Sequence, residues 1–134
     1  MTIAPVLTIA GSDSSGGAGI QADLKTMTML GCFGMSAITA LTAQNTTGVR
    51  EICPVPAAFL EQQIAAVCED IPPLAVKIGM VYDIPQIHAI AAAVRKYRLP
   101  HVVVDPVMVA TSGDALLRSQ AQTALTQELF PLAE

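Results

Sequence analysis

The sequence predicts an α/β fold in which a mostly parallel sheet carries helices on both faces, built as one domain over residues 1–134. Short apolar runs alternate with segments of about ten to fifteen residues whose apolar positions recur at helical spacing, which is typical of βαβ units. The composition agrees, because 52% of the 134 residues are hydrophobic and 13% are charged, enough apolar surface for a buried core. No Pro/Gly/Ser-rich linker divides the chain.

The first half of the chain is predicted to contribute three strands and two helices. Each strand is a short apolar run that ends at glycine, proline or a polar cluster, and each helix repeats apolar residues every three or four positions. Gly31 ends the first helix, as a glycine after the last turn often does. The strands are Val6–Ala10, Met35–Ala43 and Val49–Val55, and the helices are Ile20–Leu30 and Ala57–Glu69.

The second half continues this alternation after Pro72-Pro73. The segment Leu74–Ile78 predicts a strand, Pro85–Tyr97 a helix with an alanine-rich face, and Val102–Val104 a strand of three valines. A last helix is predicted over Ala115–Phe130. If the valine strand lies at an edge of the sheet, its apolar residues favour self-association through that edge.

Ligands of parallel sheets bind beyond the carboxyl ends of the strands, so the loops at these ends are where a site is expected. The uncommon residue choices of the sequence fall in four such loops, namely Gly11–Gly19, Gln44–Gly48, Gly79–Met80 and Asp105–Asp114. The sequence therefore predicts a binding site at one rim of the sheet.

The first of these loops contains Gly17–Ala22, a match to the GxGxxG/A dinucleotide pattern. A dinucleotide site is not favoured, because Gly11–Gly16 intervenes after the strand and the second strand ends in Gln44 instead of an acid. The Walker A pattern fails as well, since Gly17-Ala18 stands where Lys-Ser/Thr is required. Two interpretations of the loop remain. It is either a flexible connection, or a segment whose glycines let a ligand approach the backbone while the start of the next helix offers free N–H groups.

Four single residues each have a functional and an ordinary structural interpretation. Asp23 either faces a ligand or complements the helix dipole, and Gln44 either reads a heterocycle edge with an amino group or occupies a turn. Lys77 lies in an otherwise apolar strand, so its ammonium group is expected to reach an acidic partner or the cleft at the strand ends. The alternative is that the strand lies at the sheet edge and the lysine extends to water. Asp105 either faces a magnesium-bound phosphate through water or caps the next turn.

The composition also excludes several classes of function. The net charge is −4 and the seven Lys and Arg residues are scattered, so we expect no nucleic-acid partner. Apolar runs are broken before the roughly 18 residues of a spanning helix, and the N-terminus lacks a basic signal-peptide region, so we expect no membrane segment.

The cysteines and histidines show no pattern of a metal or disulfide site. We expect Cys32, Cys53 and Cys68 to be packing residues in a reducing cytoplasm. His88 and His101 stand apart from other ligands, so neither is assigned to a metal.

The string Ala10–Thr26, AGSDSSGGAGIQADLKT, closely resembles the N-terminal signature of hydroxymethylpyrimidine/phosphomethylpyrimidine kinases, which are enzymes of thiamine biosynthesis in the ribokinase-like superfamily. Further matches follow in the same order at Ala40–Thr46 (ALTAQNT), Lys77–Met80 (KIGM), Val104–Met108 (VDPVM) and Ser112-Gly113. The resemblance spans essentially the whole chain. It implies a three-layer ribokinase-like α/β fold.

By resemblance, the protein is a kinase that uses ATP with magnesium. Its acceptors are implied to be 4-amino-5-hydroxymethyl-2-methylpyrimidine and then the monophosphate of that compound. The resemblance also implies a homodimer. It implies a pocket with Gln44 against the aminopyrimidine, Asp105 toward the phosphates, and Gly11, Asp23, Met80 and Val107 completing the walls.

Members of this family are expected to be roughly twice as long as this chain. The part beyond Glu134 is expected to carry a glycine-rich anion hole, the catalytic aspartate and most of the ATP site. We therefore assign no catalytic residue and no direct metal ligand within residues 1–134, and expect an incomplete ribokinase-like domain with negligible activity by itself. Two alternatives stay open: a fragment of a pyridoxal-type kinase, and a non-catalytic module that binds the pyrimidine.

Overall fold

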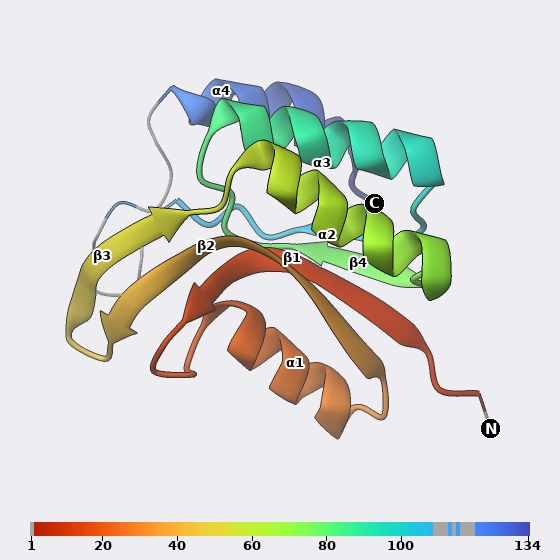
Figure 1. Cartoon of the computed structure of the whole chain (residues 1–134), viewed down its shortest axis with the longest axis horizontal. Coiled ribbons are helices and arrows are strands. Elements are labelled where there is room, and N and C mark those ends of the chain that lie inside the picture. The colour runs from red at the N-terminus through yellow and green to blue at the C-terminus, as the bar shows by residue number, and fades with distance from the viewer. Residues whose placement is uncertain (1, 109–112, 114, 116–119) are drawn as a thin grey trace.

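The computed structural model describes residues 2–108, 113, 115 and 120–134, and in this part of the chain the predicted α/β fold is confirmed. The described strands form one sheet in the order β3-β2-β1-β4-β5 (Figure 1). Strands β1, β2, β4 and β5 are parallel, whereas β3 pairs antiparallel with β2. Their bounds are β1 Pro5–Asp13, β2 Phe33–Asn45, β3 Gly48–Pro54, β4 Ala75–Ile78 and β5 Val102–Val104.

Helices cover both faces of the sheet and give the molecule three layers. In Figure 1, α1 lies below the sheet, while α2, α3 and α4 lie above it. None of the helices in the described part of the chain is long and apolar enough to cross a membrane. The bounds are α1 Gly19–Met29, α2 Ala57–Asp70, α3 Ile84–Tyr97 and α4 Ala121–Ala124, followed by a π-helical turn η1 at Leu125–Leu129 and a 3₁₀ turn η2 at Phe130–Leu132.

The two faces of the sheet differ in chemistry because side chains alternate along each strand. Leu7 and Ile9 of β1 and Ile78 of β4 are fully buried in a core shared with α2, α3 and η1. On the opposite face, Thr8 of β1 is the register partner of Lys77 of β4. The sheet thus presents an apolar face to one helical layer and a partly polar face to α1.

Gln86 in α3 is fully buried and ties this helix to the sheet. Its Nε2 group donates to the carbonyl oxygens of Thr39 and Val55, each at 2.7 Å, and its Oε1 accepts from the backbone N–H of Tyr82 at 3.0 Å. The Thr39 hydroxyl donates to the carbonyl oxygen of Met80 at 2.7 Å. These bonds hold the segment that follows β4, including Met80, against β2.

Several element boundaries differ from the sequence prediction. Strand β1 runs beyond Ala10 to Asp13, with a bulge after Ala10, because this end continues to pair with β2. Strand β2 likewise continues through Gln44, where it pairs with β3. The last helix begins at Ala121 and excludes Ala115, while residues 116–119 lie outside the described residues.

Two predictions about packing are wrong. Leu30 was expected on the apolar side of the first helix, but it is the C-cap of α1 and 75% exposed, because Gly31 with a φ of 76° turns the chain away. Among the cysteines, Cys68 is buried and Cys32 half-buried, but Cys53 is exposed. Cys53 lies on β3, which pairs with β2 beyond the helical layers, so few side chains cover it.

Strand β5 forms one edge of the described sheet. Val103 at its centre is 56% exposed. Beside it, the backbone N–H of Glu134 donates to the carbonyl oxygen of Val102 at 2.9 Å. The valine strand therefore lies at an edge of the described sheet with an apolar side chain toward solvent, the arrangement that favours self-association.

Candidate functional site

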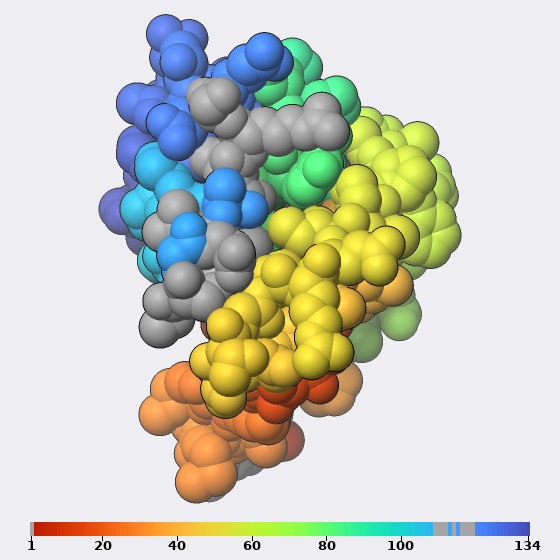
Figure 2. Space-filling view, turned by 90° about the vertical axis from the view of Figure 1, so that its left-hand side faces the viewer, coloured from red at the N-terminus to blue at the C-terminus, as the bar shows by residue number. Residues whose placement is uncertain are grey.

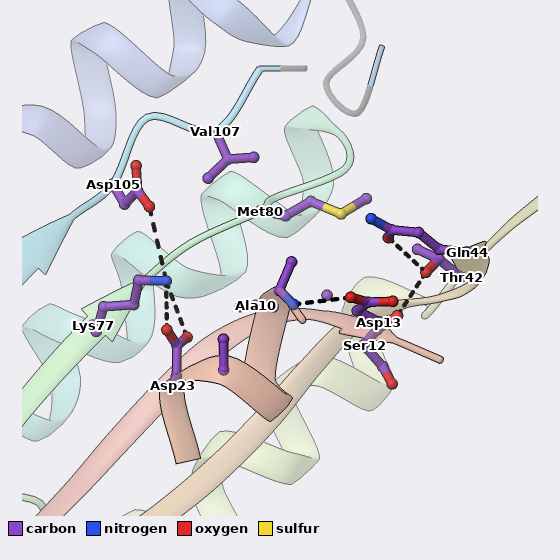
Figure 3. Close-up of a pocket in the computed structure, with 14 residues that line it drawn as sticks. Ala10, Ser12, Asp13, Asp23, Thr42, Gln44, Lys77, Met80, Asp105 and Val107 are labelled. Atoms are coloured by element: carbon purple, nitrogen blue, oxygen red, sulfur yellow. Dashed lines mark hydrogen bonds and ion pairs between the residues drawn. The ribbon is translucent and has the colours of Figure 1, made fainter. Parts of the chain in front are cut away.

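A pocket of about 340 Å³ lies at the carboxyl ends of β1, β2, β4 and β5. Figure 2 faces this end of the molecule, with the β2–β3 hairpin in yellow across the view and the region of α1 in orange below it. The close-up in Figure 3 shows the side chains that line the pocket. All the site residues expected from the sequence are among them: Gly11, Asp23, Gln44, Met80, Asp105 and Val107.

Two glycines allow a close approach of other segments to the end of β1. A Cβ on Gly11 would lie 2.7 Å from Sδ of Met80, so a side chain there would intrude on the pocket. Gly19, the first residue of α1, has a φ of 57°, and a Cβ on it would overlap the carbonyl oxygen of Gly11. The bare backbone of this loop therefore packs α1 against β1 and also leaves space for a ligand.

Asp13 at the end of β1 organises the glycine-rich loop. Its Oδ2 accepts from the backbone N–H groups of Gly17 and Ala18 at 3.0 and 2.9 Å, and its Oδ1 accepts from the backbone N–H and the hydroxyl of Ser15, both at 2.8 Å. Burial acts to raise the pKa of Asp13, but the hydrogen bonds from Ser15, Ala18 and Gly17 outweigh it and hold the pKa below its ordinary value. The carboxylate is therefore stabilised in its ionised form.

The amides of Gly17 and Ala18 lie just before α1, and the carboxylate of Asp13 occupies them, so these two are not available to a ligand. The expectation of free N–H groups in the first turn of α1 itself stays a prediction. The alternative of a flexible connection does not fit these hydrogen bonds. The loop is also tied to α1, because Nζ of Lys25 donates to the carbonyl oxygen of Gly16 at 2.9 Å.

Gln44 lies at the hairpin end of the pocket. It belongs to β2 and pairs with Val49 of β3, so the interpretation of Gln44 as a turn residue is wrong. Its Oε1 lies 3.1 Å from the hydroxyl of Thr42, and its backbone N–H donates to the hydroxyl of Ser14 at 2.9 Å. In Figure 3 the side chain of Gln44 extends from the strand toward Met80, so its amide group faces the pocket.

Asp23 and Lys77 form an ion pair at the other end of the pocket (Figure 3). Nζ of Lys77 lies 3.0 Å from both carboxylate oxygens of Asp23 and 3.9 Å from Oδ2 of Asp105. The hydroxyl of Thr8 donates to Oδ2 of Asp23 at 2.6 Å. Lys77 thus reaches an acid in the cleft, as its position in an apolar strand predicted. Asp23 lies beyond the first turn of α1, so its partners, and not the helix dipole, account for it.

Among the polar side chains that line the pocket, Asp13 and Thr42 were given no role from the sequence, and Lys77 was left out of the expected site. Asp13 carried a signal, because an aspartate in a Gly/Ser turn commonly accepts from the N–H groups that follow it. Thr42 carried none, because its direction depends on the pairing of β2 with both of its neighbours. Within the described residues, no group of three His, Cys, Asp or Glu side chains is placed to hold a metal ion.

Comparison with known proteins identifies the family. A family model described as phosphomethylpyrimidine kinase matches residues 13–134 of the chain. The hydroxymethylpyrimidine/phosphomethylpyrimidine kinase of Rhizobium meliloti is 58% identical over 127 residues, which are 95% of this chain and 47% of that protein. The chain spans about half the length of such curated relatives.

Solved structures agree with this comparison. The phosphomethylpyrimidine kinase of Clostridium difficile matches with a TM-score of 0.91 at 55% identity, over 97% of this chain and 56% of that one. The pyridoxal kinase of Staphylococcus aureus in complex with pyridoxal matches with a TM-score of 0.87 at 35% identity, over 99% of this chain and 49% of that one. The ribokinase-like architecture is thereby confirmed, and the chain belongs to the phosphomethylpyrimidine kinase family.

Proposed function

We propose that the protein to which residues 1–134 belong phosphorylates 4-amino-5-hydroxymethyl-2-methylpyrimidine and then its monophosphate, with ATP as the donor, in thiamine biosynthesis. One observation carries the proposal: Gln44, Asp23 and Asp105 line the same pocket at the carboxyl edge of the sheet. Membership of the kinase family supports the class of reaction.

The middle of the pocket suits a small flat ring. Met80 and Val107 pack together and both line the pocket, so they offer an apolar surface to the face of a heterocycle, with the buried Ala40 behind them. The amide of Gln44 can donate and accept at once, so it can pair with a ring nitrogen next to an amino group. Gly11 keeps the space beside Met80 open. The pocket therefore fits an aminopyrimidine held by its amino-bearing edge.

The other end of the pocket suits the reacting group. We orient the hydroxymethyl group toward Asp23 and Lys77, because their charged groups offer a hydroxyl both an acceptor and a donor. Asp105, whose side chain is 57% exposed, lies beside them. Because no three-ligand group is found among the described residues, magnesium would be held by the phosphates of ATP and by water, with Asp105 contacting it through water.

We assign binding and orientation to this chain, and phosphoryl transfer to the part of the full-length relatives that it does not span. The catalytic base, the anion hole and most of the ATP site belong to that part in our proposal. Since transfer depends on stabilising charge around the moving phosphoryl group, residues 1–134 by themselves are expected to bind the pyrimidine without turning over ATP. Magnesium- and pyrimidine-dependent ADP release by the purified 134-residue chain would contradict this division.

Calorimetry with 4-amino-5-hydroxymethyl-2-methylpyrimidine tests the proposed substrate. The variant Gln44→Leu keeps the approximate size of the side chain but removes its donor and acceptor, so binding should weaken about tenfold or more. Gln62→Leu, on the exposed side of α2, is the matched control and should bind like the wild type. Absence of binding by the wild-type chain would overturn the proposal.

A pyridoxal-type kinase remains the second candidate, because a pyridoxal kinase shares the fold at 35% identity. Competition between the two vitamin precursors separates the candidates. Pyridoxal that displaces the aminopyrimidine at an equal or lower concentration would favour the second candidate. A module that only binds the pyrimidine would show binding but no ATP turnover in the full-length protein.

We also propose that the full-length protein acts as a homodimer in the cytoplasm, where ATP is supplied to biosynthetic enzymes. The family resemblance supports the dimer. Sedimentation velocity on the full-length protein tests it, and a single species with the mass of a monomer would count against it.

A further inference from the structure

We propose that Lys77 is a positioning residue of the pocket, which holds the carboxylate of Asp23 so that one oxygen is left to accept the hydroxyl of the ligand. The inference rests on the proposed function, because it takes the hydroxymethyl group of the aminopyrimidine as the group that reaches this end of the pocket. It adds a role for a side chain on β4, an interior strand of the described sheet.

The position of Lys77 is built into the strands. Lys77 and Thr8 are register partners on β4 and β1, so both side chains rise on the face that α1 covers, where each contacts Asp23. Gly79 makes room for the ammonium group, because a Cβ there would lie 3.0 Å from Nζ of Lys77 and 3.0 Å from Cβ of Ala10. A lysine enclosed in this way is stable when an acid pairs with it.

The two partners are mostly shielded from water. The side chains of Lys77 and Asp23 are 26% and 16% exposed, so their attraction is screened less than that of a surface pair. The ion pair has two contacts, because Nζ lies 3.0 Å from each carboxylate oxygen. A two-point contact fixes the rotation of the carboxylate as well as its place.

The lone pairs of Asp23 indicate which oxygen can receive a ligand. A carboxylate oxygen has room for about two hydrogen bonds. Oδ2 accepts from the hydroxyl of Thr8 at 2.6 Å and from Lys77 at 3.0 Å, whereas Oδ1 accepts from Lys77 at 3.0 Å. Counting the contacts among the described residues, Oδ1 of Asp23 keeps one free acceptor position. Asp23 lines the pocket, so a ligand can use this position.

The ammonium group has a donor to offer at the same place. Two of its three N–H groups match the two contacts with Asp23. Oδ2 of Asp105 lies 3.9 Å away, which is too long for a hydrogen bond, so a ligand oxygen between Lys77 and Asp105 could take the third. A hydroxyl at this end would therefore meet an acceptor on Asp23 and a donor on Lys77.

Calorimetry with two ligands that differ by one hydroxyl tests this role: 4-amino-5-hydroxymethyl-2-methylpyrimidine and 4-amino-2,5-dimethylpyrimidine. In Lys77→Met, the affinity for the hydroxymethyl compound should fall about tenfold or more, while the affinity for the dimethyl compound should change less than about threefold. Lys77→Arg keeps the charge and can pair with a carboxylate at two points, so it should recover most of the lost affinity. Lys96→Met, on the exposed side of α3 and outside the pocket, is the matched control.

The outcomes separate this inference from the proposed function. If Lys77→Met binds the hydroxymethyl compound as the wild type does, the role of Lys77 is overturned and the proposed function stands. Equal losses for both compounds would also overturn it, because a residue that merely supports the pocket would behave in that way. If the wild-type chain binds neither compound, both proposals fail. Should circular dichroism show that Lys77→Met does not fold, Asp23→Asn takes its place, with the same hydroxyl-dependent loss expected and the same results counting against it.

Discussion

Asp13 is the single residue on which the glycine-rich loop depends most directly. In Asp13→Asn, an amide nitrogen would replace one of the carboxylate oxygens that accept from Ser15, Gly17 and Ala18. We expect the free energy of unfolding to fall by about 2–3 kcal/mol, because charge-assisted hydrogen bonds are lost and a buried donor faces other donors. Denaturant unfolding measures the change. Asp70→Asn, at the exposed end of α2, should leave the stability nearly unchanged.

The same residue sets a pH dependence whose sign follows from its lowered pKa. Asp13 has an ordinary value of 3.8 and a lower one in the folded chain, so its ionised form contributes stability that is fully present above about pH 4. This contribution is lost as the pH falls through the folded pKa. The stability difference between wild type and Asp13→Asn should therefore shrink below about pH 4. A difference that stays constant down to about pH 2 would refute the assignment.

Single residues differ in how far the sequence could predict them. Gln44 and Asp105 could be placed near the pocket because residues at parallel strand ends converge on one rim, and Lys77 because a lysine among apolar residues needs a partner. The role of Asp13 as the acceptor that closes the loop could not be predicted, because its partners are backbone N–H groups that come together only in the folded loop. Cys53 was misjudged because its exposure depends on which strand lies at the edge.

At the scale of elements, the junction of β1 and α1 depends on Gly19. Gly19 and Gly31 both have a positive φ, but a Cβ on Gly31 would meet nothing within 4 Å, whereas a Cβ on Gly19 would overlap the carbonyl oxygen of Gly11. Gly31→Ala should therefore cost about 1 kcal/mol of backbone strain, and Gly19→Ala about 1–3 kcal/mol more. Chemical denaturation of both variants measures the difference. Equal losses would mean that the contact with Gly11 relaxes freely.

Element type could be predicted from the sequence more fully than element length. The period of apolar residues specifies strand or helix locally, so the strands β1 to β5 and the helices α1 to α3 were all expected. Strand ends are instead decided by pairing with a neighbour. Ser12 and Asp13 look like loop residues, yet they extend β1 because Leu41 and Thr42 of β2 lie beside them.

At the scale of the whole molecule, the alternation of elements was sufficient to predict the three layers, because βαβ units place helices on the faces of a parallel sheet. It did not predict the order of the strands, which places β5 at one edge of the described sheet. The local pattern of three valines is the same for a central and an edge strand. Strand order depends on contacts between segments far apart in the sequence.

The exposed edge at β5 predicts self-association of the chain. Val103 is 56% exposed on an apolar strand at the edge of the described sheet, and exposed apolar strand edges can pair with one another. In Val103→Lys, a charge on the edge should shift the chain toward monomer, as measured by sedimentation velocity at several concentrations. Ile3→Lys, which replaces another apolar side chain with 60% exposure, is the control and should leave the distribution unchanged. A wild-type chain that is monomeric at all concentrations would contradict the prediction.

The carboxylate that closes the glycine-rich loop has a consequence for the thermodynamics of recognition. Chain entropy is lost when this loop becomes ordered, and here the loss accompanies folding because the acceptors belong to the protein. A ligand therefore binds to a loop that is already ordered. Because binding does not have to restrict the glycines, its entropy cost is smaller and the affinity is higher.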